Sequence, residues 1–186
     1  MIRQQGHEEQ IRTECQESLK ALFKDLPRKV PTLSEQFESQ IVAMAELTAI
    51  ARTHVYRNSY GRREVEYVPE PEANTRISKG LAAIAKGIAS INRRTRVAAE
   101  DVKDAIRVGM DCIPDYRRKL LEAAIRREPL ESVPMPRTVR TREIEELKEL
   151  TLIEEALIDS KLSDKARELL EGAGLLSQCV RGRVKL

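Results

Sequence analysis

Aromatic residues and glycine are scarce in this sequence, and each shortage excludes a class of structure. Phe, Trp and Tyr together make up 3% of the 186 residues and tryptophan is absent, so a core has to be built from aliphatic side chains. Eight glycines are too few for a glycine-rich phosphate-binding fingerprint of the dinucleotide type. Leu, Ala, Ile, Glu, Lys and Arg dominate instead, and these residues favour helices. We therefore expect a mainly α fold.

Cysteines and long apolar runs are also rare. Cys15, Cys112 and Cys179 are odd in number and far apart, without a C-x-x-C pair or a neighbouring histidine cluster, which excludes a zinc site and a disulfide framework. No apolar run approaches the roughly 20 residues of a membrane helix, and the start MIRQQGHEEQIR lacks the apolar stretch of a signal peptide. The pattern predicts reduced thiols, a cytoplasmic location and no membrane contact.

A catalytic constellation is missing. His7 and His54 are the only histidines, and neither has the neighbours of a general base. The G-x-x-x-x-G-K-[ST] phosphate loop does not occur. We expect a chain that is not an enzyme by itself, holds no metal and no cofactor, and meets ATP only through an external P-loop core.

Charge is distributed in blocks, although the net charge of +3 is only the difference between 33 basic and 30 acidic residues. Residues 116–142 contain eight basic and three acidic side chains, a balance of +5, and residues 143–171 contain ten acidic and four basic ones, a balance of −6. Such blocks indicate a face for nucleic acid or an acidic partner beside an acidic face. The alternative is a solvated surface of mixed charge.

Apolar residues recur every three or four positions along most of the chain, which is the spacing of amphipathic helices. Helices are predicted over residues 8–26, 34–56, 74–92, 99–113, 115–127, 136–153 and 163–172. REVEYV at 63–68 alternates like a short strand, and the closing QCVRGRVKL is predicted to be a strand or hairpin arm. A predicted helix contains the small residues Gly80, Ala82, Ala83, Gly87 and Ala89, which we expect to allow close approach of a neighbouring helix.

The stretch TRISKGLAAIAKGIASINRRTRVAAEDVKDAIRVGMDCIP, residues 75–114, resembles the helical lid of AAA+ ATPases, especially those near the minichromosome maintenance helicases and the MoxR ATPases. The resemblance implies that Arg76 is the arginine that senses the nucleotide γ-phosphate, for which its planar guanidinium is suited. Only 75 residues precede Arg76, so the nucleotide-binding core would be supplied by a larger assembly. A histone fold, or a plain helical core with Arg76 on its surface, would give the same pattern.

The segment PMPRTVRTREIEELKELTLIEE, which follows the predicted helix at 115–127, is similar to the recognition helix of winged-helix proteins. The resemblance implies DNA contacts from a groove-facing helix start and from a wing. The groove-facing residues would be Arg137, Thr138, Arg140, Thr141 and Arg142, and the wing residues Arg181, Arg183 and Lys185. The acidic run EIEEL would repel a DNA backbone if it faced the same way.

The sequence thus predicts two domains, a helical lid-like domain over 1–113 and a winged-helix-like domain over 114–186 that ends in a short strand or hairpin. The predicted function is the noncatalytic regulatory and DNA-binding portion of a AAA+ ATPase system. Its partners would be double-stranded DNA and an ATPase core or another protein, with self-association allowed. The alternative is a helical adaptor that binds proteins and no nucleic acid.

Overall fold

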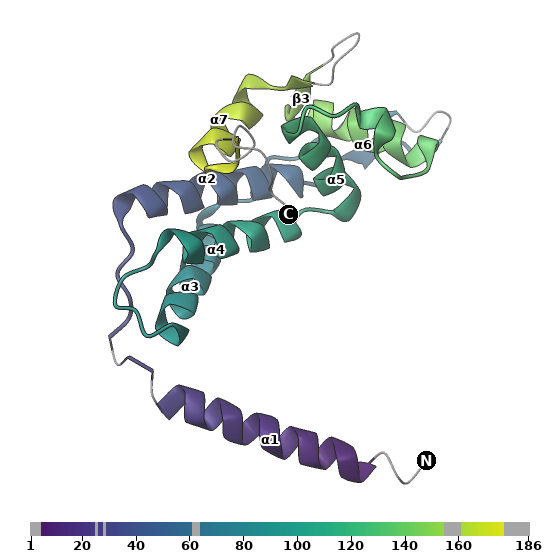
Figure 1. Ribbon diagram of the computed structural model, residues 1–186. Helices are drawn as coiled ribbons and strands as arrows, with labels where there is room; N and C mark the ends of the chain where they lie inside the picture. Colours follow the sequence, from purple (N-terminus) through teal and green to yellow (C-terminus); the bar gives the residue numbers. More distant parts are fainter. Residues whose placement is uncertain (1–4, 25, 28, 61–63, 155–160, 177–186) are drawn as a thin grey trace.

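Helices make up most of the chain, as the composition predicted (Figure 1). The computed structural model describes residues 5–24, 26–27, 29–60, 64–154 and 161–176. The helices in this part are α1 (Gln5–Lys24), α2 (Glu35–Ala51), α3 (Thr75–Ile91), α4 (Ala99–Asp111), α5 (Asp115–Ile125), α6 (Arg137–Glu149) and α7 (Asp164–Gly172), with the 3-10 turn η1 (Leu130–Ser132). Two small antiparallel hairpins pair β1 (Tyr56–Arg57) with β2 (Val65–Tyr67) and β3 (Ile153–Glu154) with β4 (Lys161–Leu162). No helix in these ranges has both the length and the apolar content to cross a membrane.

Helix α2 is the centre of the packing. It contacts α3 and α4 on one side and α7 on another, and Met44, Ala45 and Leu47 are completely buried in the core (Figure 1). Ser34 begins the helix by accepting a hydrogen bond from the backbone N–H of Phe37, as a serine cap does. Because α7 packs on α2, the last described helix returns to the first half of the chain. The predicted division at residue 113 stays a prediction.

The link between α3 and α4 is fixed by two sets of hydrogen bonds. Thr32 pairs with Arg96 in a short parallel bridge, in which Val97 donates to the Thr32 carbonyl at 2.9 Å. The buried carboxylate of Asp101 accepts a hydrogen bond from the backbone N–H of Ala98 at 2.8 Å and pairs with Arg94. The acidic start predicted for α4 is therefore an anchor for the turn as well as a partner for the helix dipole.

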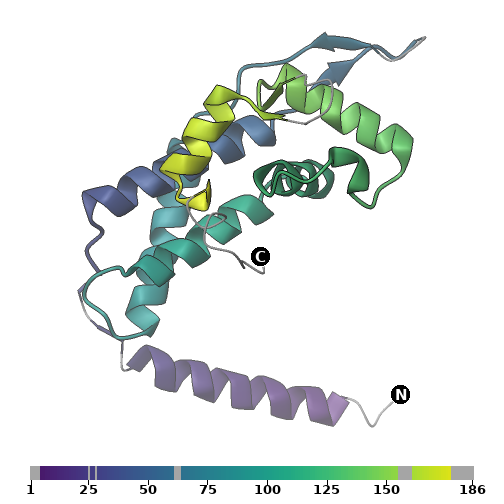
Figure 2. The ribbon, with the colours of Figure 1, turned by 45° about the horizontal axis from the view of Figure 1, so that its top comes forward.

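Helix α1 stands apart from the other helices (Figure 2). The predicted amphipathic helix is present, but the side chains described along it are exposed, including Ile11 and Phe23 at 47% and 65%. Packing within the described part of the chain thus leaves its apolar residues uncovered.

Three of the described helices end in a left-handed residue that is not glycine, whereas α7 is followed by Gly174 with φ of 77°. Arg93, Arg127 and Thr151 all have φ of 57° and follow α3, α5 and α6. The backbone N–H of the next residue then reaches a carbonyl five positions back, as from Leu152 to Leu147 at 2.9 Å. Glycine is the usual residue at such a position, because it carries no Cβ. Helix α6 therefore ends four residues before the predicted limit of 153, and Ile153 begins a strand.

Glycine has a packing role in α4 and none in α3. A Cβ added at Gly80 or Gly87 would meet nothing within 4 Å, so the prediction that these glycines allow close helix contact is wrong. A Cβ at Gly109 would lie 2.7 Å from Cγ of Met44 and 3.3 Å from Cδ1 of Leu81. The close approach of α2 and α4 thus depends on Gly109.

Alanine at these two kinds of position should have opposite effects on stability. Gly109→Ala should lower the free energy of unfolding by about 1–3 kcal/mol, because Met44 is buried and has to shift. Gly87→Ala, the matched control, should raise it by about 1 kcal/mol, because alanine favours an exposed helix interior. Urea unfolding of both variants measures this, and a stabilised Gly109→Ala protein would show that α2 and α4 are not in close contact.

Candidate nucleic-acid interface

The segment from α5 to β4 places two helices, a short turn between them and a hairpin in sequence order. Prolines at 129, 134 and 136 prevent a regular helix between α5 and α6, and only the turn η1 forms there. Leu130 and Val133 are buried and fix this connection to the core. Pro136 immediately precedes α6, so its ring sets the direction in which the helix begins.

The predicted DNA-contacting residues of α6 divide into two groups. Arg137, Thr138 and Thr141 are exposed on the first turns of the helix. The guanidinium of Arg140 instead turns back and donates to the carbonyls of Val133 and Met135 at 3.1 and 3.2 Å. Arg140 therefore holds the loop that leads into α6.

Arg142 is intermediate between the exposed residues and the inward-turned Arg140. Its side chain is 50% exposed, and it pairs with Glu143 at 2.7 Å and with Glu146 at 3.8 Å. One side of its guanidinium is thus neutralised and the other is open to solvent.

The hairpin next to α6 is built from residues other than those predicted for a wing. Strands β3 and β4 pair Ile153 with Leu162 and Glu154 with Lys161, directly after α6. The predicted wing residues Arg181, Arg183 and Lys185 lie outside the described residues. No clear sequence signal marks β3, because Ile153 continues the apolar spacing of the helix.

Basic side chains of α5 are mostly paired with acids on the same helix. Arg118 contacts Asp115 and Glu122, both at 2.8 Å, and Lys119 contacts Asp115 at 2.6 Å. Hydrogen bonds from Lys119 and Arg118 hold the pKa of the Asp115 carboxyl below its usual value. Much of the basic block predicted between 116 and 142 is therefore neutralised locally.

Two exposed arginines of this block keep their charge unpaired within the described part of the chain. Arg127 and Arg137 are both exposed and have no carboxylate at ion-pair distance there. Arg127 was not among the residues predicted to contact DNA. Its left-handed backbone has no sequence signal of its own.

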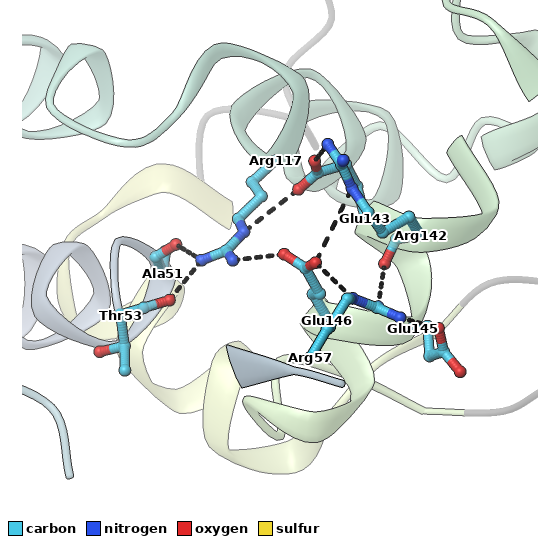
Figure 3. A network of polar contacts seen from close by, with 8 residues as sticks. All are labelled: Ala51, Thr53, Arg57, Arg117, Arg142, Glu143, Glu145 and Glu146. Atoms are coloured by element: carbon cyan, nitrogen blue, oxygen red, sulfur yellow. Dashed lines mark hydrogen bonds and ion pairs between the residues drawn. The ribbon is translucent and has the colours of Figure 1, made fainter. Parts of the chain in front are cut away.

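The acidic residues of α6 are drawn into a buried network around Arg117 of α5 (Figure 3). Arg117 is 6% exposed and donates to Glu146 at 2.6 Å and to Glu143 at 3.3 Å. Its remaining N–H groups donate to the carbonyl oxygens of Ala51 and Thr53 at 2.8 and 2.7 Å. One guanidinium thus joins the end of α2 to α5 and α6.

Arg57 of β1 completes this network from the other side (Figure 3). It donates to Glu146 at 2.9 Å, to Glu145 at 2.8 Å and to the carbonyl of Arg142 at 3.2 Å. Burial alone would raise the pKa of Glu146, but the hydrogen bonds from Arg117 and Arg57 outweigh it, and this pKa lies below its usual value. The run EIEEL is therefore compensated by arginine at Glu143, Glu145 and Glu146.

Arg76 lies in the first turn of α3, the helix predicted over residues 74–92. Its side chain is 77% exposed and pairs with Glu72 at 2.8 Å. Glu72 also contacts Arg52, with 3.3 Å between Nε and the carboxylate. Arg76 is accessible to an external ligand, which would have to compete with one surface carboxylate. Within the described ranges, no three His, Cys, Asp or Glu side chains are grouped as metal ligands.

Removal of the central arginine should strongly destabilise the fold. Arg117→Met should lower the free energy of unfolding by about 3–5 kcal/mol, because two buried carboxylates lose a partner and two carbonyls lose a donor. The matched control is Lys119→Met on the same helix, which removes one exposed pair with Asp115 and should cost about 1 kcal/mol or less. Urea unfolding distinguishes the two, and equal losses would mean that the network adds nothing.

The same network should make stability depend on acid pH. Glu146 has a lowered pKa in the folded protein, so the unfolded state binds more protons, and stability rises with pH. The contribution is complete above the unfolded value of 4.5 and is lost as the pH falls through the lower folded value. Urea unfolding at several pH values between about 6 and 3 should show a flatter dependence for Glu146→Gln than for the wild type. An unchanged dependence would place the titrating groups elsewhere.

The first turns of α6 and α3 are the two places in the described chain where predicted site residues reach solvent. Comparison with models of protein families, with curated proteins and with solved structures gave no match. What the chain does therefore has to be inferred from the residues of these two turns and their contacts.

Proposed function

We propose that this chain is the noncatalytic, DNA-binding and regulatory portion of a P-loop ATPase system. The observation that carries the DNA-binding part is the sorting of charge on α6. Three of its four glutamates contact Arg117, Arg57 or Arg142, while Arg137, Thr138 and Thr141 are exposed at its start. The acidic run then has little charge left to repel a phosphate backbone.

The order of elements supports the same proposal. In winged-helix proteins a helix enters the major groove with its first turns toward the base edges, and a hairpin follows it. Here α5, η1, α6 and the β3–β4 hairpin follow in this order. Arg137 and Arg142 would contact phosphates or guanine edges, and Thr138 and Thr141 would contact phosphates or thymine methyl groups.

The regulatory part of the proposal rests on α3 and α4. Arg76 is exposed in the first turn of α3, and the α3–α4 link is held by Asp101 and by the bridge to Thr32. In our proposal, a P-loop core outside this chain holds ATP and Arg76 contacts its terminal phosphate. ATP turnover by this chain alone, lost in Arg76→Ala, would contradict the noncatalytic part.

One observation favours a second candidate function, a helical adaptor that binds protein. Helix α1 exposes Ile11, Leu19, Leu22 and Phe23, and such a stripe is typical of a helix that docks on a partner. Salt separates the two candidates, because phosphate contacts release counterions and apolar contacts do not.

Duplex binding should be measurable by fluorescence anisotropy on a duplex of about two helical turns, titrated between about 50 and 200 mM salt. The logarithm of the binding constant should fall linearly with the logarithm of the salt concentration. Arg137→Ala should weaken binding and reduce the slope by about 1, since one phosphate contact is lost.

The matched control is Arg167→Ala on α7, an exposed arginine away from α6, which should leave the slope unchanged. Arg140→Ala should lower the melting temperature rather than change the slope, because Arg140 holds the loop before α6. Absence of binding at the lowest salt would exclude DNA and leave the adaptor function.

A further inference from the structure

The β1–β2 hairpin carries an exposed pair of stacked tyrosines. Tyr56 and Tyr67 face each other across the two strands, with ring centroids 4.4 Å apart and an interplanar angle of 5°. The ring of His54 meets Tyr56 edge-on at 4.6 Å. Each tyrosine ring covers one face of the other, and with Tyr56 and Tyr67 42% and 52% exposed the stacked pair is in contact with solvent.

A bulge in the hairpin places Tyr67 in this stacked pair. Val65 and Tyr67 are two residues apart and would share one face of a regular strand. The pairing shifts between Tyr56 and Arg57, and Val65 packs partly into the core while Tyr67 is exposed. Bulges often redirect a side chain in this way next to functional sites.

The hairpin is held against α6, which makes the stacked pair rigid. An isolated two-stranded hairpin is marginally stable in water. Here Arg57, next to Tyr56, binds Glu145, Glu146 and the carbonyl of Arg142 on α6 (Figures 2 and 3). Any ligand stacked on the tyrosines would therefore keep a fixed position relative to α6.

Tyrosine is concentrated in this small element. The chain has four tyrosines and no tryptophan, and Tyr56, Tyr60 and Tyr67 all belong to the hairpin region. Tyr60 is 85% exposed. A cross-strand pair alone would stabilise the hairpin, but it gives no reason for a third exposed ring. Tyrosine is enriched where proteins bind partners, because its ring offers a large contact area at little cost in conformational entropy.

We propose that the Tyr56–Tyr67 stack is a platform for a base of an unpaired DNA strand. The inference rests on the proposed DNA-binding function and adds single-stranded DNA next to the duplex as the substrate class. A ring stack with parallel planes fits another flat ring, and every nucleobase offers such a face. Glu64 and Glu66 are exposed on the same strand segment, so phosphates are disfavoured there and the base is the group in contact.

The test compares two duplexes of the same sequence, one with blunt ends and one with a single-stranded overhang that contains 2-aminopurine. At low salt the wild type should bind the overhang duplex at least about fivefold more tightly, which corresponds to one stacked base. Emission of 2-aminopurine should fall on binding. Tyr67→Val, which removes the ring and puts a residue of high strand propensity in its place, should lose both effects and still bind the blunt duplex.

Three controls separate stacking from folding. Tyr67→Phe keeps the ring and should keep the preference for the overhang. Tyr116→Leu removes an exposed ring from α5 and should also keep it. Thermal melting of each variant shows whether the hairpin change affects the fold as a whole.

Each outcome decides between the two proposals. Equal affinity of the wild type for both duplexes overturns the stacking inference and leaves duplex binding intact. Equal weakening of both duplexes in Tyr67→Val, with an unchanged melting temperature, also overturns it, because the ring would then not contact an unpaired base. Absence of binding to either duplex overturns the proposed function and this inference with it.

Discussion

The buried guanidinium of Arg117 determines how the second half of the chain can fold. Two of its contacts are backbone carbonyls at the end of α2, and two are glutamates of α6, so the helix that carries it, α5, is fixed between them. A buried carboxylate without a partner is costly, and Glu143 and Glu146 are each less than 10% exposed. Helix α6 can therefore bury this face only in the orientation that brings its glutamates to Arg117. The same orientation leaves Arg137, Thr138 and Thr141 exposed.

Charge on the surface of this protein is thus a result of pairing more than of composition. The basic block at 116–142 and the acidic block after it contact one another, through Arg117 with Glu143 and Glu146 and through Arg142 with Glu143. Arg57, which lies on the β1–β2 hairpin and belongs to neither block, neutralises a further carboxylate of α6, that of Glu145. Among the described residues from α5 to the start of α6, the basic side chains left without a carboxylate are a few arginines rather than a broad basic patch. If α6 binds DNA as proposed, this arrangement allows only a few phosphate contacts and hence a modest salt dependence.

The helices could be predicted from the sequence because apolar spacing is a local signal, and the seven described helices lie within the ranges where that spacing occurs or overlap them. Their ends were harder to place. Glycine usually marks the left-handed residue after a helix, whereas Arg93, Arg127 and Thr151 occupy that position here. The surroundings of α6 could not be predicted, because they depend on ion pairs between residues far apart in the chain, such as Arg57 and Glu146, which are 89 residues apart. No sequence pattern indicated that Arg76 pairs with Glu72 at the surface or that Arg140 turns inward to the carbonyl groups of Val133 and Met135.

The two candidate sites are joined through three consecutive residues at the end of α2. Ala51 and Thr53 accept hydrogen bonds from Arg117, which orients α6, and Arg52 between them pairs with Glu72, which holds Arg76. A phosphate that drew Arg76 away from Glu72 would leave Glu72 paired with Arg52 alone. A shift of Arg52 would then move the neighbouring carbonyl groups of Ala51 and Thr53, to which Arg117 is bound. The step between Arg52 and Glu72 limits this route. Both side chains are more than a third exposed, and such a pair contributes about 1 kcal/mol or less. Coupling through this pair, between the first turn of α3 and the first turns of α6, can therefore be no larger than a few-fold in affinity. Under the proposed function, a stronger response to nucleotide would have to come by another route or from the external core.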